Sequence, residues 1–174
     1  MRVGKIFLIA VSFFAFILCA RIEARSEDGV REFSRFSVVL PEGWDGEEKV
    51  GFVSDNRDEY MLALGKMEAG GDEILAQISV YVLPNANSVT PQEAAKRLAE
   101  AQGDSDEPSL AGNLWTFGGE PRTRIIRGRA VTYANATPEK MLIVVIQDPR
   151  KLGADKIFES MRGLDEETRK LLGR

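Results

Sequence analysis

The chain has 174 residues, with 23 basic and 27 acidic side chains, no histidine and one cysteine. This length fits one domain, or one domain with a tail. Without histidine, Ser-His-Asp and Cys-His catalysis are excluded, and one thiol cannot form a cysteine-rich zinc site. Any chemistry would have to use carboxylates, lysine or arginine, and we expect no metal and no cofactor.

The N-terminus has the pattern of a secretory signal. Arg2 and Lys5 precede the predominantly apolar run Ile6–Ala20, which is followed by small residues. A positive start, an apolar stretch and a small-residue cleavage site predict a signal peptide over residues 1–24. At 1.5 Å per residue the run is about 22 Å long, shorter than the ~30 Å hydrocarbon core of a bilayer. An uncleaved anchor is the alternative.

Two positions are candidates for signal cleavage. The sequence Ile22-Glu23-Ala24 predicts cleavage after Ala24, with cleavage after Ala20 as the alternative. Cys19 is a candidate for acylation, but Leu18 precedes it where lipoprotein processing prefers a small residue. We therefore expect membrane contact only if the signal is retained or Cys19 is lipidated.

Cleavage changes the charge and the thiol content of the chain. Loss of residues 1–24 removes three basic residues and one acidic residue, which leaves 20 basic and 26 acidic side chains and a net charge of −6. The mature chain has no cysteine. An acidic protein is poorly suited to bind nucleic acid. The sequence therefore predicts a periplasmic or secreted protein with no nucleic-acid partner.

The first part of the mature chain predicts a leader followed by strands. Arg25–Arg31 is polar and predicts a flexible leader. Phe36, Val38 and Leu40 alternate with more polar residues, which predicts a strand over Glu32–Leu40 that ends at the following Pro-Glu-Gly turn. Further strands are expected at Val50–Ser54, Glu59–Met67 and Glu73–Leu83, the last with an apolar face of Ile74, Ala76, Ile78, Val80 and Val82.

A helix is predicted after Thr90. Thr90 and Glu93 form a capping-box pair, Pro91 occupies the first helical position and Gly103 ends the helix. The residues expected to face inward are Ala94, Leu98 and Ala101, flanked by Ala95.

The second half of the chain predicts strands and a closing helix. Met141–Ile146 is apolar on both faces, which places its strand in the centre of a sheet with cover on each side. Helical spacing of apolar residues predicts a helix from Ala154 to Met161, and residues 165–174 are expected to form a short helix or a solvated tail. The strands expected here are Asn113–Phe117, Arg122–Tyr133 and Lys140–Gln147.

Strands grouped together, rather than alternating with helices, indicate the fold class. This order predicts an α+β protein in which helices flank an antiparallel β-sheet. We expect a single domain over residues 32–164.

Residues Phe36–Trp44 resemble the opening strand and turn of the PsbP-like superfamily. This family includes photosystem II extrinsic PsbP, bacterial DcrB-type envelope lipoproteins and a Ran-binding nuclear import factor. The closing segment Phe158-Glu159-Ser160-Met161 also fits, and the resemblance covers about Phe33–Leu164. It implies an α-β-α sandwich around an antiparallel sheet, and a protein that binds or stabilises partners rather than catalysing a reaction.

Four arginines within eight residues form the most unusual cluster of the chain. They are Arg122, Arg124, Arg127 and Arg129. The planar guanidinium group is suited to carboxylates and phosphates, so the cluster is a candidate site for an anionic ligand or an acidic protein patch. The alternative is an exposed strand whose arginines pair with neighbouring acids and discourage aggregation.

Trp44 is a second candidate binding residue, because tryptophan is enriched at binding hot spots. The alternative is a tryptophan packed at the rim of the core.

Two acidic stretches, Asp55–Glu59 and Asp104–Glu107, lack the glycine of a calcium-binding loop, so we predict solvated loops.

These features predict an exported, non-enzymatic binding or accessory protein of the cell envelope. Its partner is expected to be an envelope protein or an acidic or anionic ligand. The alternative is a small carboxylate-dependent secreted hydrolase, which would need two facing acids with perturbed pKa values in a cleft. No pair of acids stands out from the sequence, so no catalytic residue is predicted.

Overall fold

A computed structural model of the chain describes residues 29–54, 56–71, 73–120 and 126–174. The expected signal peptide, with Cys19 and both cleavage positions, lies outside the described residues, as do Arg122 and Arg124. Within the described ranges, no helix has the length and apolar character needed to cross a membrane.

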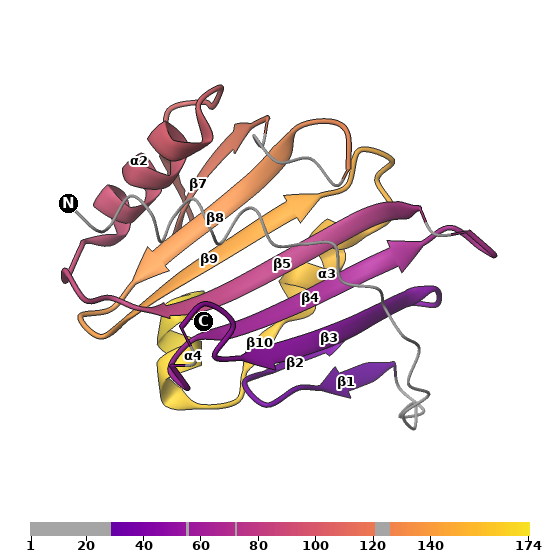
Figure 1. Cartoon of the computed structure of the whole chain (residues 1–174), viewed down its shortest axis with the longest axis horizontal. Coiled ribbons are helices and arrows are strands. Elements are labelled where there is room, and N and C mark those ends of the chain that lie inside the picture. The colour runs from indigo at the N-terminus through magenta and orange to yellow at the C-terminus, as the bar shows by residue number, and fades with distance from the viewer. Residues whose placement is uncertain (1–28, 55, 72, 121–125) are drawn as a thin grey trace.

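The described chain forms two antiparallel sheets (Figure 1). The larger sheet has seven strands in the order β3-β4-β5-β9-β8-β7-β6, and a smaller one has the order β1-β2-β10. The strands are β1 Val30–Glu32, β2 Phe36–Val39, β3 Trp44–Val50, β4 Tyr60–Met67, β5 Ile74–Pro84, β6 Ser109–Ala111, β7 Leu114–Gly119, β8 Ala130–Ala136, β9 Lys140–Gln147 and β10 Arg162–Gly163. The helices are α2 Pro91–Gln102, α3 Ala154–Ser160 and α4 Glu166–Leu172.

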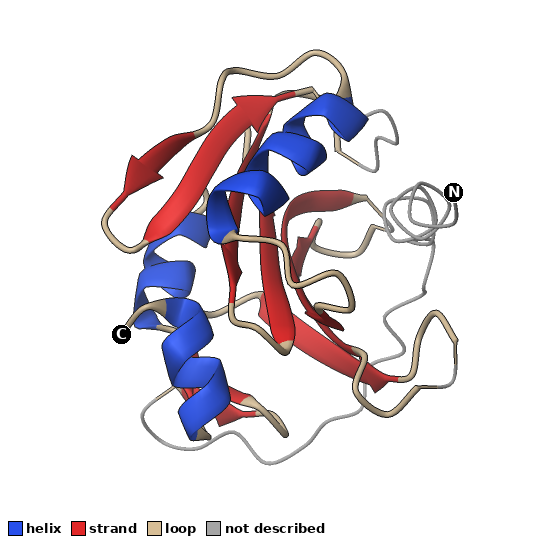
Figure 2. Ribbon diagram, turned by 90° about the vertical axis from the view of Figure 1, so that its left-hand side faces the viewer, coloured by secondary structure: helices blue, strands red, loops and turns tan. Residues whose placement is uncertain are grey.

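Helices lie on both sides of the large sheet (Figure 2). Helix α2 packs against β7 and β8 on one face, and α3 and α4 pack on the other face, where α3 also contacts β2. The predicted α+β class, with helices flanking an antiparallel sheet, is confirmed. The small second sheet was not predicted.

Alternating residues of the central strands supply two separate cores. On β5, Ile78, Val80 and Val82 are fully buried on the face that carries α3 and α4, as predicted. Tyr81 and Leu83 point to the opposite face, where they pack with residues of α2. Strand β9 is the fourth of seven strands, so the prediction of a central position with cover on both sides is also confirmed.

Helix α2 begins and ends where the sequence predicts. The Thr90 hydroxyl accepts a hydrogen bond from the Glu93 N–H at 3.3 Å, and the Glu93 carboxylate accepts one from the Thr90 N–H at 3.0 Å. Gly103 follows the helix with φ of 96°. The buried residues are Ala94, Ala95, Leu98 and Ala99, so Ala99 takes the inward position expected for Ala101.

Near the N-terminus, three predicted boundaries are wrong. Strand β1 includes residues of the expected leader Arg25–Arg31, so the domain begins before residue 32. A turn closed by the Phe33 N–H and the Phe36 carbonyl, 2.8 Å apart, divides the expected strand Glu32–Leu40 into β1 and β2. The strand expected at Val50–Ser54 is replaced by β3, which pairs along its full length with β4.

At the C-terminus the domain extends beyond the predicted boundary at residue 164. Residues 165–174 contain α4, and Leu171 and Leu172 are buried in the core. The Asp165 side chain accepts a hydrogen bond from the Thr168 N–H at 2.7 Å and caps the helix. The Asn135 side-chain amide donates to the Leu171 carbonyl at 2.8 Å, so the last helix is fixed to β8.

Candidate functional site

Arg127 and Arg129, the described arginines of the cluster, do not lie in a strand as predicted. Strand β8 begins at Ala130, and residues 126–129 before it form an irregular bend. Gly128 has φ of 122°, which a strand of L-residues does not allow. The alternation of faces expected for Arg122–Tyr133 therefore does not apply to Arg127 and Arg129.

Both described arginines of the cluster are exposed. Arg129 donates to Asp106, with Nη2 and Oδ2 2.6 Å apart. This hydrogen bond, and the negative charge of Asp106, raise the pKa of Arg129. Arg129 therefore pairs with a neighbouring acid, as the alternative interpretation of the cluster predicts. Both side chains of the pair are exposed, so solvent screens the attraction between their charges.

The fold brings the segment that carries Arg150 and Lys151 beside the segment that carries Arg127. Strands β8 and β9 are antiparallel, with Val131 opposite Ile146, so the segment before β8 lies beside the segment after β9. A Cβ atom added to Gly128 would lie 3.4 Å from Cβ of Pro149. We call the group formed here the basic corner; it consists of Arg127, Arg129, Arg150 and Lys151.

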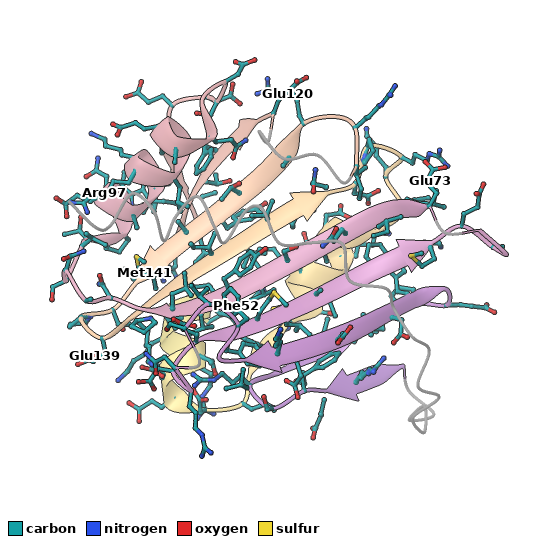
Figure 3. The ribbon with its side chains drawn as sticks, viewed as in Figure 1. Phe52, Glu73, Arg97, Glu120, Glu139 and Met141 are labelled. Carbon is teal, nitrogen blue, oxygen red and sulfur yellow. The ribbon has the colours of Figure 1, made fainter. Side chains whose placement is uncertain are left out.

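Acidic neighbours compensate only part of the basic corner. Arg150 Nη2 lies 3.7 Å from Glu73 Oε1, and Figure 3 shows Glu73 at this end of the sheet. Asp106 pairs with Arg129. Within the described ranges, Arg127 and Lys151 have no acidic partner. Two exposed cations at one corner can bind a carboxylate or a phosphate.

The loop that carries Arg150 and Lys151 is held in place by an internal carboxylate. Asp148 Oδ1 accepts from the Leu152 N–H at 2.7 Å, and Oδ2 accepts from the Gly153 and Ala154 N–H groups at 3.0 Å. This loop, unlike the arginine cluster, was not singled out by the sequence. The signal that could have found it is the closeness in sequence of two predicted strands, Arg122–Tyr133 and Lys140–Gln147, because antiparallel pairing of such neighbours brings their two outer ends together.

Trp44 is not an exposed binding residue. Its exposed fraction is 6%, and it belongs to the core on the α3 and α4 side of the sheet. The indole N–H donates to the Leu152 carbonyl at 3.4 Å. Trp44 is therefore part of the core, as the alternative predicts, and its indole also connects β3 to the loop before α3.

The carboxylates of the described residues do not form a metal-binding group. The part of the chain that the structure describes contains no cluster of three or more His, Cys, Asp or Glu side chains placed to hold a metal ion. Hydrogen bonds from Lys140, the Thr90 backbone and Lys170 lower the pKa values of Asp58, Glu93 and Glu166, respectively. A carboxyl group that acts as a general acid near neutral pH needs the opposite shift.

The comparisons with known proteins include a match to a solved structure. No protein-family model matches the chain, and no curated protein matches its sequence. The structure is similar to the solution structure of cyanobacterial PsbP from Synechocystis sp. PCC 6803, with 11% identity and a TM-score of 0.45. The match covers 83% of this chain and 98% of that protein, and it concerns the fold alone.

Proposed function

We propose that this chain is an exported, non-enzymatic binding protein of the cell envelope, which holds an acidic segment of a partner protein at its basic corner. The observation that carries the proposal is the pair of uncompensated cations, Arg127 and Lys151, in a chain with a net charge of −4. Export is supported by the positive start and the apolar run Ile6–Ala20.

The basic corner suits recognition of carboxylates. Arg127 offers a planar donor group that binds a carboxylate through two parallel hydrogen bonds. Asp148 fixes the loop of Lys151, so less conformational entropy is lost when that loop binds a partner. Because all four basic side chains are exposed, we expect binding to weaken as the salt concentration rises.

A charge-reversal pair tests this proposal. We expect Arg127→Glu to weaken capture of the partner from native envelopes at least tenfold, because it replaces an attraction by a repulsion. Lys156→Glu is the matched control, since it makes the same charge change at an exposed position of α3. Both variants should melt like the wild type. Equal capture by the wild type and Arg127→Glu would refute the proposed site.

A further inference from the structure

The place that Arg129 offers to a partner of the basic corner is already occupied by a carboxylate of the chain itself. Asp106 accepts a hydrogen bond from Arg129, with Oδ2 and Nη2 2.6 Å apart. A guanidinium group binds a carboxylate of its own chain and one of a partner through the same kind of hydrogen bond. The Asp106 carboxylate therefore shows how a partner carboxylate can bind at Arg129.

The backbone around Asp106 is fixed to the sheet and to α2. The Asp106 N–H donates to the Gly118 carbonyl of β7 at 2.7 Å. The hydroxyl of the preceding Ser105 donates to the Ala99 carbonyl of α2 at 3.0 Å. Because these bonds hold the backbone in place, the carboxylate stays within reach of Arg129 and competes there with any external carboxylate.

A glycine makes room for the ion pair. A Cβ atom added to Gly118 would lie 2.7 Å from Asp106 Oδ2 and 3.3 Å from Arg129 Nη2, so both groups lie directly over β7. Gly118 pairs with Val131 of β8, and Val131 is 41% exposed. Residues that pair across two strands point to the same face of the sheet. The ion pair therefore lies on an open part of the sheet, where a partner segment can reach it.

The contact between the two side chains can be exchanged at small cost. The exposed fractions of the Arg129 and Asp106 side chains are 55% and 62%, so water screens their attraction. An exposed ion pair of this kind contributes a factor of about five or less to an equilibrium. The hydrogen bond to Asp106 uses one of the five N–H donors of an arginine, so a partner carboxylate can bind beside Asp106 and then replace it.

The four cations of the basic corner therefore differ in their availability. Arg150 has an acidic neighbour, but its Nη2 lies 3.7 Å from Glu73 Oε1, which is beyond hydrogen-bond distance. No described acid pairs with Arg127 or Lys151. Arg127 and Lys151 can attract a partner at once, whereas Arg129 becomes available only when Asp106 is displaced.

We infer that Asp106 is an internal ligand of the basic corner, which a partner displaces from Arg129 with a carboxylate of its own. The partner segment then carries at least two neighbouring carboxylates, one for Arg127 and Lys151 and one for Arg129. A segment with a single acid uses Arg127 and Lys151 and leaves Arg129 paired with Asp106. The inference rests on the proposed function, because it concerns the same corner, and it adds the class of segment that the corner selects.

Titration with hexaglutamate, a peptide of six glutamates, tests the inference when arginine side chains of the protein are observed by NMR. We expect Asp106→Asn to bind hexaglutamate about threefold more tightly than the wild type at low salt, since no internal acid then occupies Arg129. In 1 M salt the two affinities should converge, because the Debye length falls to about 3 Å. Hexaglutamate should shift the Arg129 signals of the wild type, and acetate at the same carboxylate concentration should not.

Glu166→Gln is the matched control. Glu166 also forms an exposed ion pair, with its Oε1 2.7 Å from Lys170 Nζ, so the substitution removes the same charge. Helix α4 lies at the other end of β8, where the Lys170 carbonyl accepts from the Asn135 side chain, roughly 20 Å from Arg129 along the strand. Glu166→Gln should therefore bind hexaglutamate like the wild type.

A double-mutant cycle shows whether the effect of Asp106 passes through Arg129. In a chain that already carries Arg129→Gln, we expect Asp106→Asn to change hexaglutamate binding by less than about 1.5-fold, since no guanidinium group remains there to be released. A threefold gain that persists with Arg129→Gln would overturn the inference.

Failure of the inference and failure of the proposed function give different results. If Arg127→Glu weakens hexaglutamate binding but Asp106→Asn binds no more tightly than the wild type, the corner binds acids and Asp106 does not compete with them. Equal shifts of the Arg129 signals by acetate and by hexaglutamate would show that one carboxylate is enough, against the inference. If hexaglutamate binding is absent or does not depend on Arg127, the proposed site and the inference are both refuted.

Discussion

Replacing Asp148 by alanine is expected to lower the free energy of unfolding by about 3 kcal/mol. Its carboxylate accepts hydrogen bonds from the N–H groups of Leu152, Gly153 and Ala154, at 2.7 to 3.0 Å. Alanine would leave these three donors without their charged acceptor at the start of α3. In a chain of this size the melting temperature should fall by about 6–12 °C.

Thermal unfolding of Asp148→Ala and Asp155→Ala measures this effect. Asp155 is exposed in the first turn of α3 and has the same charge, so its removal should change the free energy of unfolding by less than about 0.5 kcal/mol. If the two variants melt at the same temperature, the Asp148 carboxylate does not hold the loop. A loosened loop should also weaken partner capture, because it carries Arg150 and Lys151.

Alkaline pH is expected to unfold the protein cooperatively above about pH 10. Burial raises the pKa values of Tyr60, Tyr81 and Tyr133, which are all the tyrosines of the chain. At Tyr60, the hydrogen bond from its hydroxyl to Glu48, 2.8 Å long, adds to the rise. The folded state therefore holds the phenolic protons more tightly than the unfolded state.

The sign of the pH dependence follows from this difference. Tyrosines of the unfolded chain ionise at about pH 10, so the stabilisation is complete below that pH and is lost as the pH rises. Tyr60 and Tyr81 should each remove about 1.4 kcal/mol of stability per pH unit above 10. Tyr133 is only half-buried, so it contributes less.

Tyrosinate absorbance and circular dichroism, recorded in one alkaline titration, test this coupling. The two signals should change together, because the phenols ionise only when the sheet unfolds. Tyr81→Phe should reduce the slope of stability against pH. Tyrosine ionisation close to pH 10 in a chain that keeps its folded spectrum would contradict the prediction.

Local patterns were sufficient to predict the elements with strong periodicity. The alternation along β5 and the capping box of α2 depend on residues close in sequence, and both are confirmed. Strand β3 was missed because most of its residues are polar or exposed, and its conformation depends on pairing with β4. Strand β10 has two residues, and it pairs with β2, more than 120 positions earlier in the chain.

Some residues of the candidate sites could likewise be predicted from local sequence, whereas others join the sites only through the fold. The density of arginines in sequence indicated Arg127 and Arg129, but Arg150 and Lys151 join them only through the β8–β9 pairing. The indole of Trp44 contacts the carbonyl of Leu152, which lies 108 residues away, so no local pattern could show this contact.

Site-specific photo-crosslinking in native envelopes tests the central claim, binding at the basic corner, most directly. A photoreactive residue at position 149 keeps all four basic side chains, and Pro149 is exposed beside Gly128. We predict a crosslink from position 149 to an acidic segment of one envelope protein. A photoreactive residue at position 156 on α3 should give no crosslink to that protein. Adding Arg127→Glu should abolish the crosslink from position 149. Equal crosslinking from both positions, or a crosslink that persists with Arg127→Glu, would contradict the claim.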